Sequence, residues 1–198
     1  MIFLLRHGQT EFNSQDRVQG RIDSPLTALG VAQARAMGER LKAIADSEGG
    51  RWEIETSPLG RARQTAGIVA EAMGLPAPTI DARLAEVSYG DLEGLTVSEA
   101  RAHAPQFATG DSIFGRAPGG ETYAALAARV ADWLSDHPED AGRHLVAVSH
   151  AGTSRMARGL YLGLDEPAIR ALDKPQGVVF RLHGGRIERF ECAPVAAP

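Results

Sequence analysis

Two short runs of apolar residues predict strands that are covered on both faces. One spans residues 2–5 and the other residues 144–149, and neither run alternates with polar positions as a half-exposed strand would. Shorter segments predict further strands, and the last two form a hairpin because paired glycines lie between them. These segments are residues 52–56, 79–84, 177–182 and 186–190.

Between these strands, apolar residues recur at helical spacing. Thr27 is the predicted N-cap of the first helix. Ser57 and Pro58 are the predicted N-cap and first residue of the second helix, which Gly74 ends. The predicted helices cover about 27–44, 57–74, 121–136 and 152–162, and one more begins near residue 96.

This alternation predicts an α/β fold of three layers, with helices on both faces of a mostly parallel sheet that has an antiparallel edge. The chain has 198 residues, of which 43% are hydrophobic, so we expect one substantial core and a single domain over 1–198. Residues 105–120, which contain several Gly and Pro, are long for a connection. They predict a mobile lid within a lid-like insertion at about 95–120.

Composition excludes several classes of protein. Cys192 is the only cysteine, so an intrachain disulfide and a cysteine-based zinc site are excluded, and a reducing, cytoplasmic location is expected. The first apolar run is too short for a signal peptide or a membrane span. The net charge is -4 and the basic residues are scattered, so neither nucleic acid nor a membrane is an expected partner. A monomer and a homodimer are both compatible with these features.

A histidine ends each of the two buried strands. His7 and His150 are each followed within two residues by a glycine, and ligands of open α/β sheets bind beyond the carboxyl ends of the strands. Arg6 precedes His7, and Arg61 lies in the first turn of a predicted helix, where unpaired N–H groups and the helix dipole favour an anion. Two guanidinium groups and two imidazoles suit a phosphoryl group, because arginine matches phosphate oxygens in bidentate fashion.

Five motifs along the chain together resemble the histidine phosphatase superfamily, also called the phosphoglycerate mutase-like family. The motifs are LLRHGQTEFN at 4–13, SPLGRARQTA at 57–66, LAEVSYGDLEG at 84–94, PGGETYAALAARV at 118–130 and VAVSHAG at 146–152. Each motif alone is weak, but their ordered combination is specific and covers nearly the whole chain. The resemblance implies a phosphoglycerate mutase-like fold.

The resemblance also implies a role for each matched residue. His7 is implied to be the nucleophile that becomes phosphohistidine, with Arg6, Arg61 and His150 holding the phosphoryl oxygens and Glu86 donating a proton. Other residues expected to bind the phosphate are Asn13, Gln19, Gly20 and Ala151. Many relatives have glycine where this chain has Ala151, and we expect a small steric effect from that methyl group.

The residues support the same chemistry without the family name. A histidine nucleophile must present an unprotonated nitrogen, and flanking arginines lower the pKa of an imidazole. We expect the other nitrogen of His7 to donate to a backbone carbonyl, with that of Gly8 as the candidate. An alkoxide leaves slowly without a proton, so a carboxylic acid such as Glu86 is needed nearby. This scheme requires no metal and no cofactor.

Each assigned residue also has a purely structural interpretation. Arg61 fits an exposed helix face, His150 a hydrogen-bonded strand end, Asn13 an Asx turn and Gln19 a loop position. As proton donor, Glu86 competes with three nearby carboxylates, Asp81, Asp91 and Glu93. Four further histidines are interpreted as structural groups at surface or edge positions, namely His103, His137, His144 and His183. A metal site is disfavoured because the chain lacks HExxH spacing.

The shortness of the insertion and its scarcity of basic residues favour hydrolysis over return of the phosphoryl group to the substrate. The mutases of this family carry additional Arg and Lys residues after the proton donor, whereas here no lysine follows Gly94 in this region and 105–120 offers only Arg116. We therefore predict a phosphatase that acts on a small phosphorylated metabolite. A cofactor-dependent phosphoglycerate mutase and a non-catalytic phosphate-binding module are the alternatives, and the substrate itself is not readable from the sequence.

Overall fold

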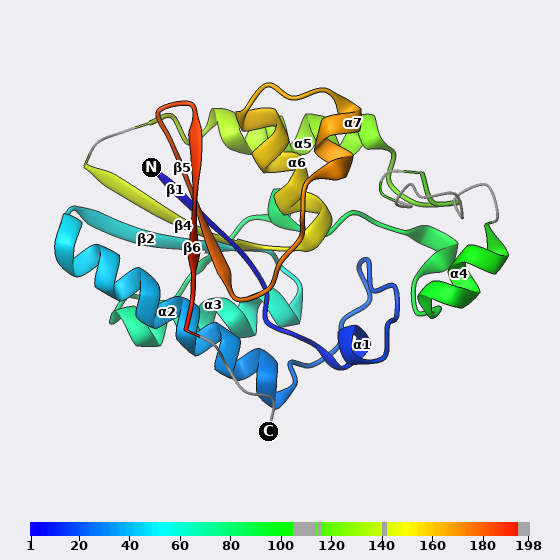
Figure 1. The fold of residues 1–198 in the computed structure, drawn as a ribbon, viewed down its shortest axis with the longest axis horizontal. Coiled ribbons are helices and arrows are strands. Elements are labelled where there is room, and N and C mark those ends of the chain that lie inside the picture. The colour runs from blue at the N-terminus through cyan, green and yellow to red at the C-terminus, as the bar shows by residue number, and fades with distance from the viewer. Residues whose placement is uncertain (105–113, 115, 140–141, 194–198) are drawn as a thin grey trace.

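A six-stranded mixed sheet forms the centre of the computed structural model, which describes residues 1–104, 114, 116–139 and 142–193 (Figure 1). The strand order is β3-β2-β4-β1-β5-β6. The first four strands in that order run parallel, whereas β5 and β6 pair antiparallel along one edge. The strands are β1 (Ile2–Arg6), β2 (Arg51–Thr56), β3 (Thr79–Ile80), β4 (Arg143–Ser149), β5 (Val178–His183) and β6 (Arg186–Glu191).

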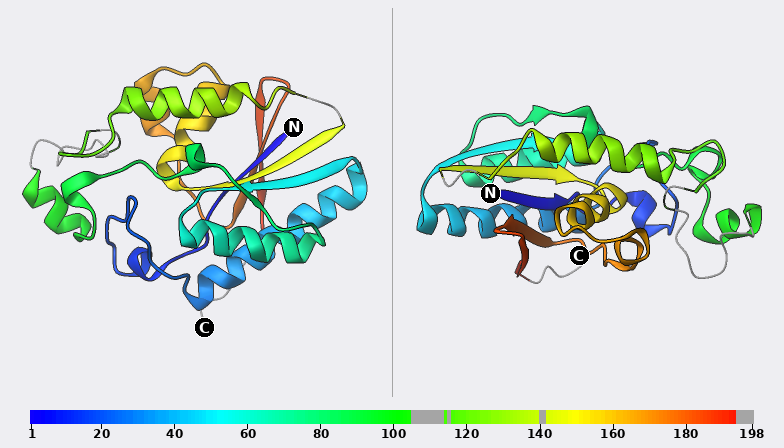
Figure 2. Two further views of the ribbon diagram at one scale, coloured as in Figure 1. Left: turned by 180° about the vertical axis from the view of Figure 1, so that it is seen from behind. Right: turned by 90° about the horizontal axis from the view of Figure 1, so that it is seen from above.

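Helices cover both faces of this sheet (Figure 2). The helices α2 and α3 pack on one face together with Phe3 and Leu5, whereas α5, α6 and α7 cover the other face, which receives Ile2 and Leu4. The helices are α1 (Glu11–Ser14), α2 (Ala28–Glu48), α3 (Gly60–Met73), α4 (Val97–His103), α5 (Tyr123–Ser135), α6 (Ala151–Tyr161) and α7 (Glu166–Ala171). The predicted three-layer fold with an antiparallel edge is therefore confirmed.

The register of the central strands brings the two strand-end histidines together. Arg6 of β1 pairs with Ser149 of β4, so His7 and His150 leave adjacent parallel strands at the same level. The His7 amide donates to the Ser149 carbonyl at 3.0 Å, and the Ser57 amide donates to the Val148 carbonyl at 3.0 Å. Three segments that are distant in sequence thus meet at one end of the sheet.

Several predicted boundaries were wrong for identifiable reasons. The second predicted helix, α3, begins at Gly60 rather than at Pro58, because the Ser57 side chain bonds the Leu59 amide and His150 instead of capping a helix. The predicted strand 79–84 is only two residues long, and a 3-10 turn that Asp81 caps follows it. The helix expected from 121 begins at Tyr123. The hairpin, the Thr27 cap and the stop at Gly74 are confirmed.

The segment between β3 and α5 extends away from the sheet and carries α4 at its far end (Figure 1). Beneath α4 lies a small apolar cluster that is separate from the two cores on the sheet faces. Its buried members are Val18, Leu92, Ala100, Ala104 and Ala117. Of the predicted lid, residues 105–113 and 115 lie outside the described residues, while Phe114 is fully buried in the core beside α5. Among the described residues, no helix is long and apolar enough to span a membrane.

Candidate active site

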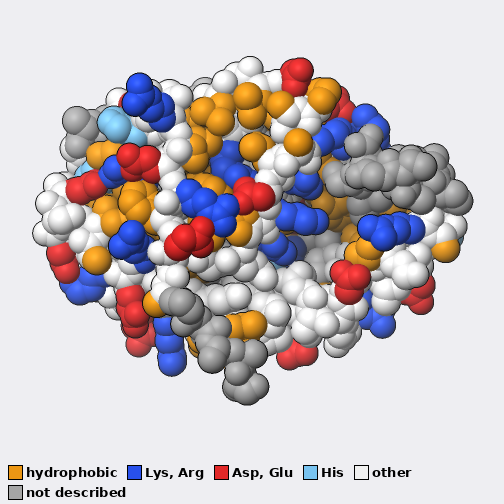
Figure 3. Space-filling model, viewed as in Figure 1, with side chains coloured by type: hydrophobic (Ala, Val, Ile, Leu, Met, Phe, Trp, Pro, Cys, Tyr) orange, Lys and Arg blue, Asp and Glu red, His pale blue; other side chains and the backbone are white. Residues whose placement is uncertain are grey.

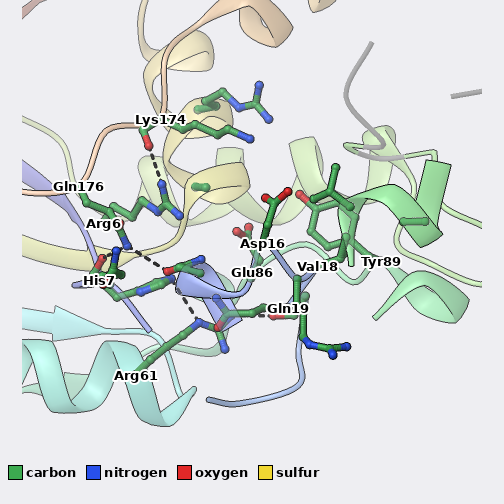
Figure 4. Close-up of a pocket in the computed structure, with 18 of the residues that line it drawn as sticks. Arg6, His7, Asp16, Val18, Gln19, Arg61, Glu86, Tyr89, Lys174 and Gln176 are labelled. Atoms are coloured by element: carbon green, nitrogen blue, oxygen red, sulfur yellow. Dashed lines mark hydrogen bonds between the residues drawn. The ribbon is translucent and has the colours of Figure 1, made fainter. Parts of the chain in front are cut away.

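A cavity of about 580 Å³ opens at the carboxyl ends of β1 and β4. Its walls come from the turn after β1, the start of α3, the segment around Glu86, α4, α6 and the connection that precedes β5. Figure 3 shows several Lys and Arg side chains gathered around this hollowed region. In Figure 4, the side chains of Arg6, His7, Arg61 and Glu86 converge on it. The cavity therefore lies where the strand-end histidines predicted a ligand site.

The His7 ring is held in one tautomer by hydrogen bonds at both nitrogens. Nδ1 lies 2.7 Å from the Gly8 carbonyl, to which it can only donate, and Nε2 accepts from Nε of Arg61 at 3.2 Å. The side chain is buried, with 3% of the residue exposed. Burial, followed by the charges of Arg6 and Arg61, holds the pKa of His7 well below its usual value. Nε2 of His7 is therefore unprotonated and faces Arg61 at the cavity.

The turn that carries His7 is fixed by close backbone packing against α2. A Cβ on Gly8 would lie 2.2 Å from the carbonyl oxygen of Gly30, and a Cβ on Gly30 would lie 2.0 Å from that of Gln9. The Gly8 amide also donates to Oγ1 of Thr65 on α3 at 3.1 Å. Glycine is required at both contacts because any side chain would force β1 and α2 apart.

Arg61 is a buried residue of the first turn of α3, so the exposed-face interpretation is wrong. Its Nη2 donates to the Gly20 carbonyl at 2.7 Å, and its Nη1 donates to the Ile22 carbonyl at 2.9 Å and to Asp23. Asp23 also accepts from the Arg61 amide at 3.2 Å. The expectation that this helix terminus receives the substrate anion needs correction, because Asp23 already occupies the Arg61 amide.

His150 is fully buried behind the His7 ring as the N-cap of α6. The two ring centroids are 5.1 Å apart, and Nε2 of His150 lies 2.7 Å from Oγ of Ser57. Burial and the charges of Arg61, His7 and Arg6 hold the pKa of His150 well below its usual value. Its Nδ1 is buried and has no hydrogen-bond partner among the described residues.

Glu86 is a buried carboxylate that lines the cavity together with Asp16. It is buried at the N-terminus of α6, where its Oε1 accepts from the amides of Val87, Gly152 and Thr153 at 2.9, 3.1 and 3.1 Å. Among the described residues, its Oε2 accepts only from the Gly152 amide, at 3.1 Å. A Cβ on Gly152 would lie 2.7 Å from Oε1, so glycine permits this approach. Oε2 therefore retains the lone pair that can hold a transferable proton.

The competing carboxylates are engaged elsewhere. Asp81 bonds Arg83, and Glu93 accepts from Oγ of Ser88 and from the Tyr89 amide. Neither they nor Asp91 lines the cavity, whereas Glu86 does. Of the four acidic residues that the sequence offered as proton donor, only Glu86 lines the cavity, and its role as donor stays a prediction.

Asn13, Gln19, Gly20 and Ala151 all line the cavity, as predicted. Oδ1 of Asn13 accepts from the Thr10 amide, which completes the capping box of α1, and also from Gln176 at 3.1 Å. Nε2 of Gln19 donates to Oγ1 of Thr10 at 2.7 Å. Both side chains therefore have structural partners, and their phosphate-binding roles stay predictions.

The sequence analysis missed several residues that line the cavity. They are Gln9, Asp16, Arg17, Tyr89, Arg101, Arg155, Lys174 and Gln176. Arg155 had a usable signal, since it follows Ala151 by four residues and so shares its face of α6. No local pattern marks Lys174, which lies between α7 and β5.

Neither His150, which lies behind His7, nor the four remaining histidines are among the residues that line the cavity. The expectation of a surface or edge position was wrong for His144, which is buried on the central strand β4 and stacks on Trp52 with ring centroids 4.5 Å apart. His137 contacts Glu55 at 3.2 Å. Among the described residues, no cluster of three or more His, Cys, Asp or Glu side chains is arranged to hold a metal ion.

A family model described as "Histidine phosphatase superfamily (branch 1)" matches residues 2–189. The chain belongs to the histidine phosphatase superfamily. Among relatives in this superfamily, a protein from Citrobacter koseri named "Probable phosphoglycerate mutase GpmB" is 37% identical over 175 residues. The match covers 86% of this chain and 79% of that relative.

Solved structures with the same fold are also similar to this chain. A mycobacterial glucosyl-3-phosphoglycerate phosphatase, described as a complex with VO3, superposes with a TM-score of 0.75 at 30% identity and covers 96% of each chain. YhfR of Bacillus stearothermophilus gives a TM-score of 0.78 at 28% identity, covering 94% of this chain and 93% of its own. The chain is thus an enzyme of the phosphatase or mutase type.

Proposed function

We propose that this histidine phosphatase hydrolyses a small phosphomonoester through a phosphohistidine at Nε2 of His7, without a metal or cofactor. The observation that carries the proposal is the pair of hydrogen bonds on the His7 ring, Nδ1 to the Gly8 carbonyl and Nε2 to Arg61. In this tautomer Nε2 carries no proton, and its lone pair accepts from Nε of Arg61, a hydrogen bond that must break when Nε2 attacks phosphorus. The low pKa of His7 keeps that lone pair available at neutral pH.

In the first half-reaction, Nε2 of His7 forms a bond to phosphorus while the bond between phosphorus and the ester oxygen breaks. The developing charge is spread over three oxygens, and we assign their binding to Arg6, Arg61 and Nδ1 of His150. If Ser57 donates to Nε2 of His150, then Nδ1 carries the proton and donates to the phosphoryl oxygen. Oε2 of Glu86 supplies a proton to the departing alcohol.

In the second half-reaction, water attacks the phosphorus atom and the bond to Nε2 of His7 breaks. The Glu86 carboxylate, deprotonated by the first step, accepts a proton from this water. Inorganic phosphate then leaves, and Nε2 regains its lone pair. The backbone donors around Oε1 hold the same carboxylate in place through both steps.

A phosphoglycerate mutase is the second candidate function. The relatives near 37% identity carry that name. The sequence argument for hydrolysis counted basic residues only after the proton donor, but the cavity also receives Arg155 and Lys174 from later in the chain. Those two cations supply what a substrate with a carboxylate would need, so the count alone does not decide between the candidates.

Hydrolysis of p-nitrophenyl phosphate in the presence of a chelator tests the proposal. We expect turnover that a chelator leaves unchanged and vanadate inhibits, together with an acid-labile phosphoenzyme that His7→Ala abolishes. Loss of activity in chelator, or a phosphoenzyme that persists in His7→Ala, contradicts this mechanism. Interconversion of 2- and 3-phosphoglycerate that exceeds hydrolysis when 2,3-bisphosphoglycerate is added would favour the mutase.

A further inference from the structure

Arg155 is a buried cation without a carboxylate partner among the described residues. The residue is 5% exposed and lies on α6, on the cavity side of the helix. Its Nη1 donates to the Arg170 carbonyl at 2.9 Å, its guanidinium lies 4.8 Å from the centroid of the Phe114 ring, and its Nε has no partner among these residues. A buried charge is costly unless an opposite charge accompanies it. The side chain is thus held in place, but no carboxylate among the described residues neutralises its charge.

The neighbouring arginine on the same helix shows the contrast. Arg158 is equally buried, but its Nη1 donates to Asp173 at 2.9 Å. Arg170, which packs beside Phe114, pairs with Glu166 at 2.7 Å. Both of these neighbouring arginines therefore have an acidic partner, whereas Arg155 has none among the described residues.

Lys174 brings a second, exposed cation to the same wall. It lies in the connection before β5, and in Figure 4 its side chain extends over the cavity beyond Arg6. It forms no ion pair within the described part of the chain, although Asp16 and Glu86 also line the cavity. Partial loss of water around the ammonium, followed by the charges of Arg155 and Arg6, lowers the pKa of Lys174, and Glu86 and Asp16 oppose this shift.

These two cations lie beyond the groups that would hold the transferred phosphoryl. On α6, Arg155 follows Ala151 by four residues, which corresponds to about 6 Å along the helix axis. The phosphoryl oxygens already have Arg6, Arg61 and His150 in the proposed mechanism. An anion at Arg155 and Lys174 would therefore be a different group on the same substrate, a few bonds from the ester oxygen.

We infer that Arg155 and Lys174 form a subsite for a second anionic group on the alcohol portion of the substrate. The inference rests on the proposed function, since it takes the ester to bind at His7. The substrate class is then a phosphomonoester whose alcohol bears a carboxylate or another phosphate. Both groups accept bidentate hydrogen bonds from arginine and attract the lysine ammonium.

Matched substrates that differ only in the second charge test this subsite. We compare 3-phosphoglycerate with glycerol 3-phosphate, in which an alcohol replaces the carboxylate, and propane-1,3-diol bisphosphate with 3-hydroxypropyl phosphate. We expect kcat/KM to favour the doubly anionic member of at least one pair by about tenfold or more. The pair with the larger preference identifies the second group. Equal kcat/KM within both pairs overturns the inference.

Arg155→Gln and Lys174→Gln remove the two charges separately. Each should lower kcat/KM by about tenfold for the preferred doubly anionic substrate and by less than about twofold for its singly charged partner. The matched control is Lys42→Gln, because Lys42 is the only other lysine and is exposed on α2, where it pairs with Asp46. Lys174 is exposed at the cavity rim, so its variant tests the subsite even if loss of the Phe114 contact unfolds Arg155→Gln. An equal loss on both members of a pair overturns the inference.

Binding to the His7→Ala variant separates failure of the subsite from failure of the proposed function. Calorimetric titration of this variant requires no turnover. We expect His7→Ala to bind the doubly anionic substrate more tightly than its singly charged partner, and the added Lys174→Gln substitution to remove this difference. This result supports the subsite even if the wild-type enzyme hydrolyses nothing. If the wild-type enzyme hydrolyses both members of a pair and His7→Ala binds both with equal affinity, the proposed function is supported and the subsite is overturned.

Discussion

At the scale of single residues, the site depends on hydrogen bonds that fix which nitrogen or oxygen reacts. The Gly8 carbonyl selects the tautomer of His7, Ser57 bonds His150, and the three amides at Oε1 leave Oε2 of Glu86 for the proton. None of these partners is a charged side chain. In the proposed mechanism, backbone groups and one hydroxyl, together with Arg61 at Nε2 of His7, hold the reacting atoms in position before substrate arrives.

Arg61 provides the residue-scale prediction. Arg61→Ala should lower kcat for p-nitrophenyl phosphate by about 10²- to 10³-fold, because it removes a donor to developing phosphoryl charge. Arg63→Ala is the control, since Arg63 is exposed two residues further along α3. Steady-state kinetics on both variants gives the comparison. A loss for Arg61→Ala that is no greater than for Arg63→Ala would return Arg61 to a purely structural role.

At the scale of elements, α6 combines three tasks within its first two turns. Its N-cap is His150, its first amides bind Glu86 and its fifth residue is Arg155. The spacing of these groups follows from helix geometry, so they move together if the helix moves. A change at the start of α6 should therefore affect proton transfer as well as phosphoryl binding.

Thr153 permits a test of this coupling. Its hydroxyl donates to the Ala85 carbonyl at 2.6 Å, which ties α6 to the segment that carries Glu86. Thr153→Val keeps the side-chain shape but removes the hydroxyl, and we expect kcat to fall by about tenfold for an alkyl phosphate. For p-nitrophenyl phosphate, whose leaving group needs little protonation, the loss should be several times smaller. Ser154→Ala serves as the control, and equal losses on both substrates would contradict a role in orienting the acid.

The elements also show where sequence patterns stop being informative. The long helices and central strands were predicted because many apolar residues repeat their period. The helices α1 and α7 were missed because four and six residues are too few to establish a period. The start of α3 was misplaced because Ser57 and Pro58 have the residue types of a helix start, whereas Ser57 is held by a hydrogen bond to His150. That partner lies 93 residues away, so no local rule could include it.

At the scale of the whole molecule, the sequence analysis found the residues in motifs and missed those that only the fold brings together. His7, Arg61 and His150 were identified because they follow strands or open a helix in a known pattern. Lys174 reaches the cavity because β5 pairs antiparallel with β1, which places the preceding connection beside Arg6. This juxtaposition depends on sheet order, which the residues around Lys174 do not encode.

Stability of the whole molecule should depend on pH through the buried histidines. The pKa values of His7 and His150 lie well below 6.5, so the native state keeps both rings neutral where the unfolded chain binds protons. The contribution of these two rings to the free energy of unfolding should thus be constant above this pH and fall below it, by about 1.4 kcal/mol per pH unit for each ring. Urea denaturation between about pH 5.5 and 8 measures this dependence.

The matching variant is His7→Asn, which removes one of the two rings. Its unfolding free energy should decline less steeply below about pH 6.5, with a slope smaller by about 1.4 kcal/mol per pH unit. Between about pH 7.5 and 8 the two proteins should show the same slope, because both rings are then neutral in either state. Parallel curves for wild type and variant across the whole range would contradict a neutral, buried His7.

The contact between Gly8 and Gly30 restricts how this enzyme can diverge. Backbone meets backbone there, so neither position tolerates a side chain and the β1 turn cannot shift on α2. New substrates must be accommodated by changes on the opposite walls of the cavity, where Val97, Arg101 and Lys174 come from α4 and from the connection before β5. A library that randomises these three positions should yield altered specificity, whereas variation at Gly8 or Gly30 should yield mainly misfolded protein.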